Sequence, residues 1–263
     1  MLVKIYGSAV FGIDATTITI EVNIDKGIGY HLVGLPDNAI KESSYRIAAA
    51  LSNIGYQLPG KKITINMAPA DLRKEGAAYD LPLAIGILAA SGQLKKDDFS
   101  QAIIMGELSL DGSVQPIKGA LPIALQAKND GFTEIFLPKD NVQEAAIVNG
   151  LNVFAIENIS DLIRHFEEKV VLEKVVLATE TLFDVDADLN LFDFAEVKGQ
   201  ENIKRALEIA AAGGHNILLI GPPGSGKTML AKRLPSILPP MTMEEALETT
   251  KIHSVVGKVQ NVG

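Results

Sequence analysis

The order of hydrophobic and polar positions divides the N-terminal part of the chain into strands and helices. Residues 17–24 alternate strictly between polar and apolar side chains, the period of a strand with one buried face. Turn-forming residues follow at 25–29, and the mostly apolar stretch 30–33 after them predicts a hairpin. A helix is expected over 36–54, because its apolar residues recur on one side and Gly55 ends it.

Farther along the chain, strands and helices are expected to alternate. Strands are predicted at 63–67, 103–110, 135–137 and 153–156. Helices are predicted at 80–90, from 119 onward, at 141–149 and at 160–167. Strands first, followed by strand–helix alternation, indicate an α+β domain at residues 1–170 that folds alone. Its longest apolar run, 81–90, is too short to cross a bilayer, which needs about 20 residues, and is expected to form a core helix.

The chain changes character at residues 171–194. This segment is acidic and lacks Gly and Pro, yet it keeps many apolar side chains. We interpret it as a connector that packs on one of its neighbours. A second unit is expected over 195–263, in which a short buried strand at 216–220 precedes a helix at 229–234 that Pro235 ends.

Composition narrows the class of protein. A length of 263 residues suggests two domains at about 150 residues each, and a hydrophobic content of 47% excludes a disordered chain. The absence of cysteine excludes disulfides, thiolate zinc sites and cysteine nucleophiles, and the four histidines lie too far apart to suggest a metal site. Without a targeting segment or membrane span, a soluble cytoplasmic protein is expected. The net charge of −8 does not suggest an autonomous nucleic-acid-binding protein.

Residues 221–228 read G-P-P-G-S-G-K-T and fit the P-loop pattern G-x-x-x-x-G-K-[ST] completely. Such a loop directs backbone N–H groups toward phosphate oxygens at the start of a helix. Lys227 is expected to contact the β- and γ-phosphates and the Thr228 hydroxyl to bind Mg²⁺, so ATP and Mg²⁺ are the expected cofactors. The loop residues expected to contact the nucleotide are Gly221, Pro222, Pro223, Gly224, Ser225, Gly226, Lys227, Thr228 and Met229.

Hydrolysis requires a further element, a strand ending in Asp or Glu that holds Mg²⁺ and the attacking water. No apolar run after Thr228 ends in an acid, and Glu244-Glu245 begins a predicted helix instead. We therefore expect the sequence to stop inside its ATPase module. Such a fragment would bind ATP without hydrolysing it, and no catalytic residue is assigned.

The neighbourhood of the P-loop resembles a known family. Residues 196–201 and 204–216 look like the opening of an AAA+ module, in which the V-x-G-Q stretch lies beside the adenine ring. The resemblance adds Val197, Gly199 and Gln200 to the expected nucleotide site. Residues 230–240 and 252–257 are similar to the magnesium-chelatase branch of that class.

The N-terminal 170 residues narrow the resemblance. With V-K-I-Y-G at 3–7 and V-G-L-P-D at 33–37, they resemble the YifB/ComM family of Mg-chelatase-like proteins, across essentially the whole chain. The resemblance implies a homo-hexameric AAA+ ATPase, with members that act on DNA and drive branch migration during natural transformation. It also implies an N-terminal domain with the fold of the Lon protease domain.

The resemblance to Lon predicts an inactive protease site. The Lon motif K-D-G-P-S-A-G corresponds to residues 74–80, so Ala78 stands at the nucleophile's position, and the P-x-G-G-L stretch places Leu121 at that of the general-base lysine. Alanine has no proton to give and leucine cannot accept one, so no Ser–Lys dyad is possible there. Ser113 and Lys118 remain as an alternative, displaced dyad.

Two other functions stay open at this stage. One is a metal-chelatase subunit or protein-remodelling chaperone, whose P-loop would look the same. The other is an ATP-dependent Lon-like protease. Among further polar residues, Arg73-Lys74 before the glycine loop is a candidate for a central pore, and His215 is expected to cap or pack rather than to bind a ligand.

Overall fold

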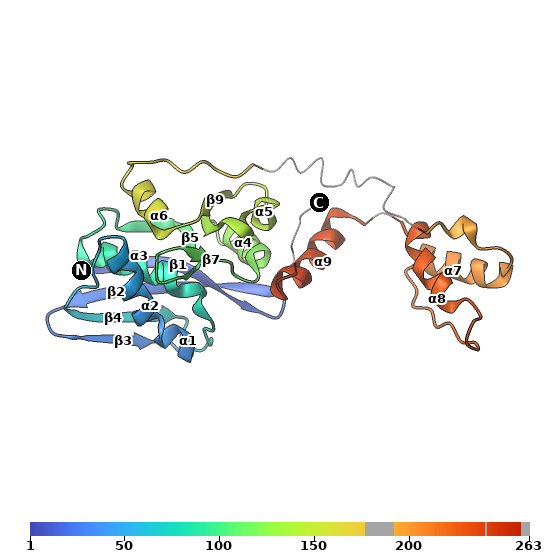
Figure 1. Ribbon diagram of the computed structural model, residues 1–263, viewed down its shortest axis with the longest axis horizontal. Coiled ribbons are helices and arrows are strands. Elements are labelled where there is room, and N and C mark those ends of the chain that lie inside the picture. The colour runs from blue at the N-terminus through green and yellow to red at the C-terminus, as the bar shows by residue number, and fades with distance from the viewer. Residues whose placement is uncertain (177–191, 240, 259–263) are drawn as a thin grey trace. The chain divides into compact units, whose positions relative to one another are not determined.

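The computed structural model describes residues 1–176, 192–239 and 241–258, and its contacts divide the chain into two compact units. The first contains Met1–Ala178 together with Thr249–Val262, and the second contains Thr179–Glu248. Most of the predicted connector, at 177–191, lies outside the described residues. Figure 1 shows the elements of both units along the chain.

A seven-stranded mixed sheet forms the centre of the first unit, in the order β3-β4-β2-β1-β5-β8-β9. The strands are β1 Leu2–Phe11, β2 Asp14–Asp25, β3 Gly29–Val33, β4 Lys62–Ala68, β5 Asp98–Ile104, β8 Glu134–Pro138 and β9 Asn152–Ile156. Strand β2 is antiparallel to both of its neighbours, whereas the other four pairs are parallel. Two further strands, β6 Glu107–Leu108 and β7 Val114–Gln115, form a separate two-stranded ribbon. The fold is therefore mixed α/β.

Helices join and cover these strands. They are α1 Asn38–Lys41, α2 Ser43–Asn53, α3 Asp80–Ser91, α4 Ala120–Asn129, α5 Val142–Ala146 and α6 Ile159–Phe166, with short 3₁₀ turns at Ala77–Tyr79 and Lys139–Asn141. Residues 80–90 of α3 are all buried, which confirms the core helix predicted there. The alternating pattern of 17–24 is likewise confirmed, because the apolar residues of β2 are its buried ones.

Two predictions about the sheet are wrong. Strands β2 and β3 do not form a hairpin, because β4 lies between them and pairs with both. The predicted strand 103–110 is broken at Met105-Gly106, where Met105 donates its N–H to Phe136 and Gly106 to Ala78. Strand β6 therefore leaves the main sheet and pairs with β7 instead.

The described start of the connector packs on the first unit. Val175 donates its backbone N–H to the Val153 oxygen at 2.8 Å, and Lys174 forms a bridge with Phe154. These contacts place the segment along the free edge of β9. Residues 177–191 are not covered by this observation.

The second unit is helical in its described residues. It contains a 3₁₀ turn Phe194–Glu196, helices α7 Glu201–Gly213 and α8 Lys227–Arg233, and a 3₁₀ turn Leu234–Ile237. Its buried core consists of Phe194, Val197, Leu207 and Leu230. The buried strand predicted at 216–220 is wrong: the segment is irregular, and Leu218 and Ile220 are more than four-fifths exposed. A strand needs a neighbour, and this unit shows none among its described residues.

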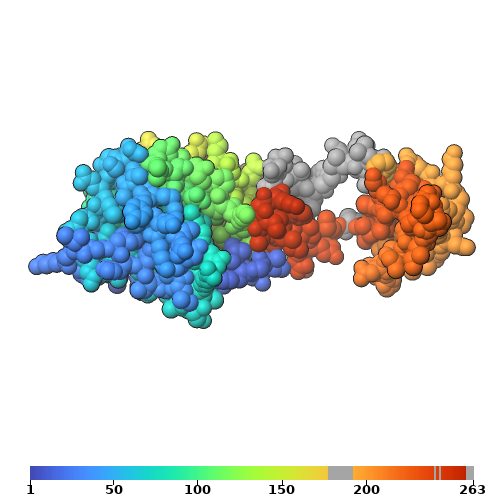
Figure 2. All heavy atoms as spheres, turned by 60° about the horizontal axis from the view of Figure 1, so that its bottom comes forward, coloured from blue at the N-terminus to red at the C-terminus, as the bar shows by residue number. Residues whose placement is uncertain are grey.

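Helix α9, Met243–Val255, ends on the first unit. The buried Ser254 accepts the Gly119 backbone N–H through its carbonyl oxygen at 3.0 Å and the Leu121 N–H through Oγ at 3.4 Å. Lys251 pairs with Asp14 at 2.9 Å. Figure 2 shows this last part of α9 against the end of the β1–β2 hairpin and α4. Within the described ranges, no helix has both the length and the apolar character to cross a membrane.

Candidate functional site

The P-loop of the second unit turns sharply into a helix. Gly224 and Gly226 have φ of +82° and +84°, a region that L side chains rarely adopt, and Lys227 is the first residue of α8. These two glycines of the motif thus stand where the backbone requires them. As predicted, a helix follows the loop, and the chain leaves it for a 3₁₀ turn at Leu234, next to Pro235.

The Lys227 side chain folds back over the loop. Its ammonium donates to the Gly221 and Pro222 carbonyl oxygens at 2.8 Å each, and to Ser225 Oγ at 3.4 Å. All three acceptors are neutral, so they do not cancel the positive charge of the side chain. An ammonium held over a loop of backbone amides fits an anionic ligand such as a phosphate. The adjacent Thr228 is exposed, which leaves its hydroxyl accessible.

The V-x-G-Q stretch lies beside this loop. Gln200 takes a left-handed backbone conformation at the start of α7, and its Nε2 lies 3.6 Å from where a Cβ on Gly226 would stand. Val197 is buried in the same small core as Leu230 of α8, against which Met229 also packs. The structure therefore brings Val197 and Gln200, distant in sequence, to the helix that carries the P-loop.

The acidic pair after the P-loop, Glu244 and Glu245, lies at the start of a helix. Glu245 accepts from the Thr242 backbone N–H at 2.8 Å and from its hydroxyl at 3.0 Å, and these bonds lower the pKa of the Glu245 carboxyl. Both acids lie in the first turn of α9, where negative charge is stabilised by the helix dipole. The described residues contain no group of three or more His, Asp and Glu placed to hold a metal ion.

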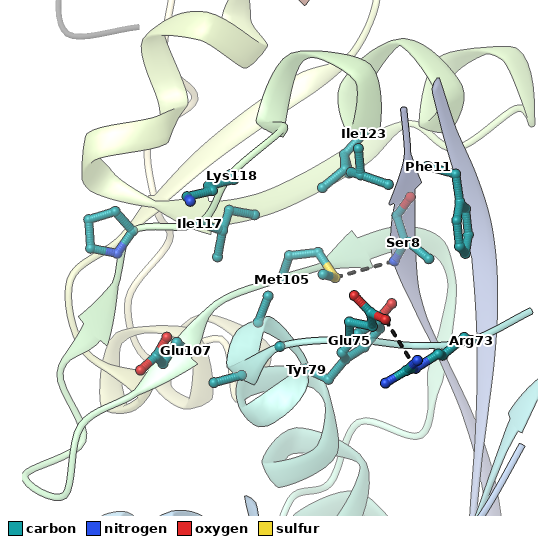
Figure 3. A pocket seen from close by; sticks show the side chains of 16 residues that line it. Ser8, Phe11, Arg73, Glu75, Tyr79, Met105, Glu107, Ile117, Lys118 and Ile123 are labelled. Atoms are coloured by element: carbon teal, nitrogen blue, oxygen red, sulfur yellow. Dashed lines mark hydrogen bonds and ion pairs between the residues drawn. The ribbon is translucent and has the colours of Figure 1, made fainter. Parts of the chain in front are cut away.

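A second candidate site is a cavity of about 520 Å³ in the first unit (Figure 3). It lies between the end of β1, the loop before α3 and the start of α4. Ala78, the residue matched to the Lon nucleophile, is among the residues that line it. On α4, however, Ile123 lines the cavity, whereas Leu121 is fully buried in the core. Residues 121 and 123 lie on different sides of the helix, so the side chain at the position matched to the Lon lysine packs in the core rather than in the cavity.

The alternative dyad is also separated. Lys118 lines the cavity, but Ser113 does not: its hydroxyl donates to Asp111 at 2.7 Å in the turn that precedes β7. The two residues of the basic pair Arg73-Lys74 also lie in different environments. Arg73 is exposed and pairs with Glu75, whereas Lys74 is fully buried and donates to the Pro69 carbonyl oxygen. The pore interpretation is therefore wrong for Lys74, and burial lowers the pKa of its ammonium.

Sequence reasoning missed the ion pair between the half-buried Arg46 and the fully buried Asp80, which follows the cavity residue Tyr79. Arg46 donates to the Asp80 carboxylate through Nε at 2.6 Å and Nη2 at 2.9 Å, and also to the Ala39 oxygen at 2.9 Å. The Leu108 N–H adds a longer bond at 3.3 Å. Burial raises the pKa of the Asp80 carboxyl, although Arg46 acts in the opposite direction. The pair joins α1, α2, α3 and β6, and its 34-residue separation gives no local signal.

Comparisons with known proteins agree with the features of the second unit. A family model described as subunit ChlI of Mg-chelatase matches residues 20–141, and one described as magnesium chelatase, subunit ChlI, matches residues 193–263. Both matches support the Mg-chelatase-like AAA+ class. The chain belongs to the YifB/ComM family of this class.

The individual relatives cover nearly the whole chain. Over 253 residues it is 44% identical to the YifB protein of Escherichia coli, a match that covers 96% of this chain and 49% of that protein. Over 259 residues it is 42% identical to competence protein ComM of Haemophilus influenzae, with 97% and 50% covered. The chain thus spans about half the length of the curated relatives it matches.

A more distant match is to a Lon protease. The chain is 26% identical over 125 residues to Lon protease 2 of Bacillus subtilis, which covers 47% of this chain and 22% of that protein. This similarity is weak beside the YifB/ComM matches.

Proposed function

We propose that this chain is the ATP-binding part of an AAA+ motor that, as a whole protein, remodels DNA in recombination. The observation that carries the nucleotide site is the complete P-loop motif at a helix start, with the Lys227 ammonium over the loop. Membership of the Mg-chelatase-like class supports nucleotide and Mg²⁺ dependence, and the name of the competence protein ComM supports the DNA role.

In this proposal each loop residue has a physical task. The backbone N–H groups of the loop 221–226, apart from its two prolines, would donate to phosphate oxygens, Lys227 would exchange its carbonyl partners for the β- and γ-phosphates, and the Thr228 hydroxyl would bind Mg²⁺. Gly199, Gln200 and Val197 lie toward the base. The Mg²⁺ ion would supply charge neutralisation between the phosphates. The whole protein acts as a homo-hexamer in the cytoplasm.

The first unit, with a Lon-like fold, has no peptidase role in this proposal. Ala78 and Ile123 offer the cavity neither a nucleophile nor a base, and the Ser113 hydroxyl lies outside it. A Ser–Lys mechanism needs a hydroxyl beside a neutral amine. Casein degradation that Lys118→Ala abolishes would favour the Lon-like protease instead.

The test is ATP hydrolysis by the whole protein, with and without branched DNA, alongside Lys227→Ala. We expect DNA to stimulate hydrolysis, and Lys227→Ala to weaken nucleotide binding at least about tenfold, which corresponds to about 1.4 kcal/mol. Lys232→Ala is the matched control, since it removes an exposed lysine of the same helix. Nucleotide affinity unchanged in Lys227→Ala would refute the P-loop assignment. Hydrolysis indifferent to DNA would redirect the proposal to a chelatase or protein-remodelling partner.

A further inference from the structure

The cavity of the first unit lies where β1 runs past its neighbour. Strand β1 pairs with β2 along its whole length, from Leu2 to Phe11. On its other side it pairs with β5 only at Lys4 and Tyr6. Among the described residues, no strand continues this side of β1 beyond Tyr6, and residues 8–11 line the cavity there. The edge of β1 is therefore open toward the cavity.

A backbone N–H on this edge has no strong hydrogen-bond acceptor as its partner. The buried Ser8 N–H donates to the Met105 sulfur at 3.2 Å, and a thioether is only a weak acceptor (Figure 3). Backbone groups of a strand alternate in direction, so those of Val10 point to the same side as those of Ser8. A peptide carbonyl would be a better partner for the Ser8 amide than sulfur, because amide–carbonyl bonds are stronger.

The walls next to this edge are apolar, and their charges balance. Tyr79, Met105, Ile117 and Ile123 are buried or nearly so, and about 520 Å³ lies within the range of ligand pockets. Arg73 and Glu75 neutralise each other at 3.0 Å, and the remaining charged lining residues, Lys118 and Glu107, have opposite signs. Because these charges balance, the rim has no net positive charge that would attract a phosphate or a nucleic acid. It suits an uncharged peptide backbone that carries an apolar side chain.

We propose that this cavity binds an extended peptide segment of a partner protein, which adds as a strand to the edge of β1 at Ser8–Phe11 and places one apolar side chain among Ala78, Met105 and Ile123. Main-chain hydrogen bonds supply affinity in this mode, and the side-chain pocket supplies selectivity. The site binds and does not cleave. It stands independently of the P-loop, so it survives if the motor assignment fails.

The probe is fluorescein-labelled acetyl-Ser-Thr-Leu-Thr-Ser-amide, a neutral peptide with one apolar side chain, measured by fluorescence anisotropy with the full 263-residue chain. We expect saturable binding that Ala78→Phe weakens at least about tenfold, because the ring fills the cavity. Ile28→Ser is the matched control: Ile28 is 92% exposed and lies outside the cavity lining, so its removal lowers non-specific apolar attraction alone. Circular dichroism of each variant confirms that it folds.

A second arm leaves the protein unchanged. Two versions of the peptide carry N-methyl groups on alternate amides, one on each set. Only the set that faces β1 should lose binding, by about tenfold or more. No binding at millimolar protein, equal binding of both methylated peptides, or unchanged binding in Ala78→Phe would each overturn the proposal. Displacement of the peptide by a short oligothymidylate would assign the cavity to nucleic acid and overturn it as well.

Discussion

At the scale of single residues, the buried Asp80 and the half-buried His165 of the first unit each depend on a specific partner. Asp80 is fully buried at the start of α3 and depends on Arg46, while His165 lies among the rings of Phe136 and Phe154 at 5.5 Å from each. A polar group taken out of water costs free energy unless a partner compensates it, so removing the partner of either residue should lower the stability of the fold.

Removing Arg46 should be costly. Arg46→Met leaves the Asp80 carboxylate without its cation, and breaking a buried pair costs about 3–5 kcal/mol. Because burial raises the Asp80 pKa in the fold, protonation relieves this loss, so the deficit should shrink as pH falls. Urea unfolding at about pH 7 and about pH 5 measures both effects. Arg164→Met, which removes an exposed pair with Asp161, should cost under about 1 kcal/mol; equal losses would contradict the prediction.

His165 should make stability depend on pH. Its Nδ1 accepts the Leu172 N–H at 3.1 Å, which requires the neutral ring, and burial lowers the His165 pKa. A base whose pKa is lower in the folded state contributes stability above its unfolded pKa of about 6.5, and loses it as pH falls through the folded value. The urea midpoint should drop between about pH 7.5 and about pH 5, and His165→Gln should flatten that drop. His31→Gln, at an exposed histidine, should leave it intact; a flat profile in the parent chain would refute the assignment.

At the scale of elements, the end of α9 serves as a cap for α4. The first turn of a helix leaves backbone N–H groups without intrahelical partners, and α4 begins at Ala120 with no side-chain cap of its own. Ser254 supplies two acceptors here, its carbonyl oxygen for the N–H of the N-cap residue Gly119 and its hydroxyl for the Leu121 N–H. A segment about 130 residues away in sequence thus completes this helix start.

This cap predicts a local effect of Ser254→Ala. Losing the hydroxyl removes the acceptor of the Leu121 N–H, worth about 1 kcal/mol, so exchange of that amide should accelerate about fivefold. Hydrogen exchange followed by NMR at Leu121 measures it, with the Gly119 amide less affected because its partner is a backbone oxygen. Ser236→Ala removes a comparable hydroxyl acceptor, that of the Phe194 N–H in the second unit, and serves as control. Unchanged exchange at Leu121 would show that the cap is not formed in solution.

At the scale of the whole molecule, the sequence predicts individual strands and helices but not which elements that are distant in sequence lie side by side. The strand at 17–24 and the helix at 80–90 were predictable because burial repeats along the element itself. The insertion of β4 between β2 and β3, and the meeting of β1 with Ile123, depend on residues far apart in sequence. The strand at 216–220 failed for a related reason. An apolar run becomes a strand only when another strand pairs with it, and the described residues of the second unit include no strand.

Two separate cores predict two unfolding transitions for the chain. Among the described residues, the second unit has a core cluster of four buried residues, far smaller than the core of the first unit, so we expect it to melt first in calorimetry. Mg-ATP at about 100 times its dissociation constant should stabilise the unit that binds it by about 2.7 kcal/mol and therefore raise the lower transition alone. In Lys227→Ala this shift should vanish while the upper transition keeps its position, because the variant leaves the first core intact. A nucleotide shift of the upper transition would instead place ATP on the first unit, and a single transition would show that the two cores unfold together.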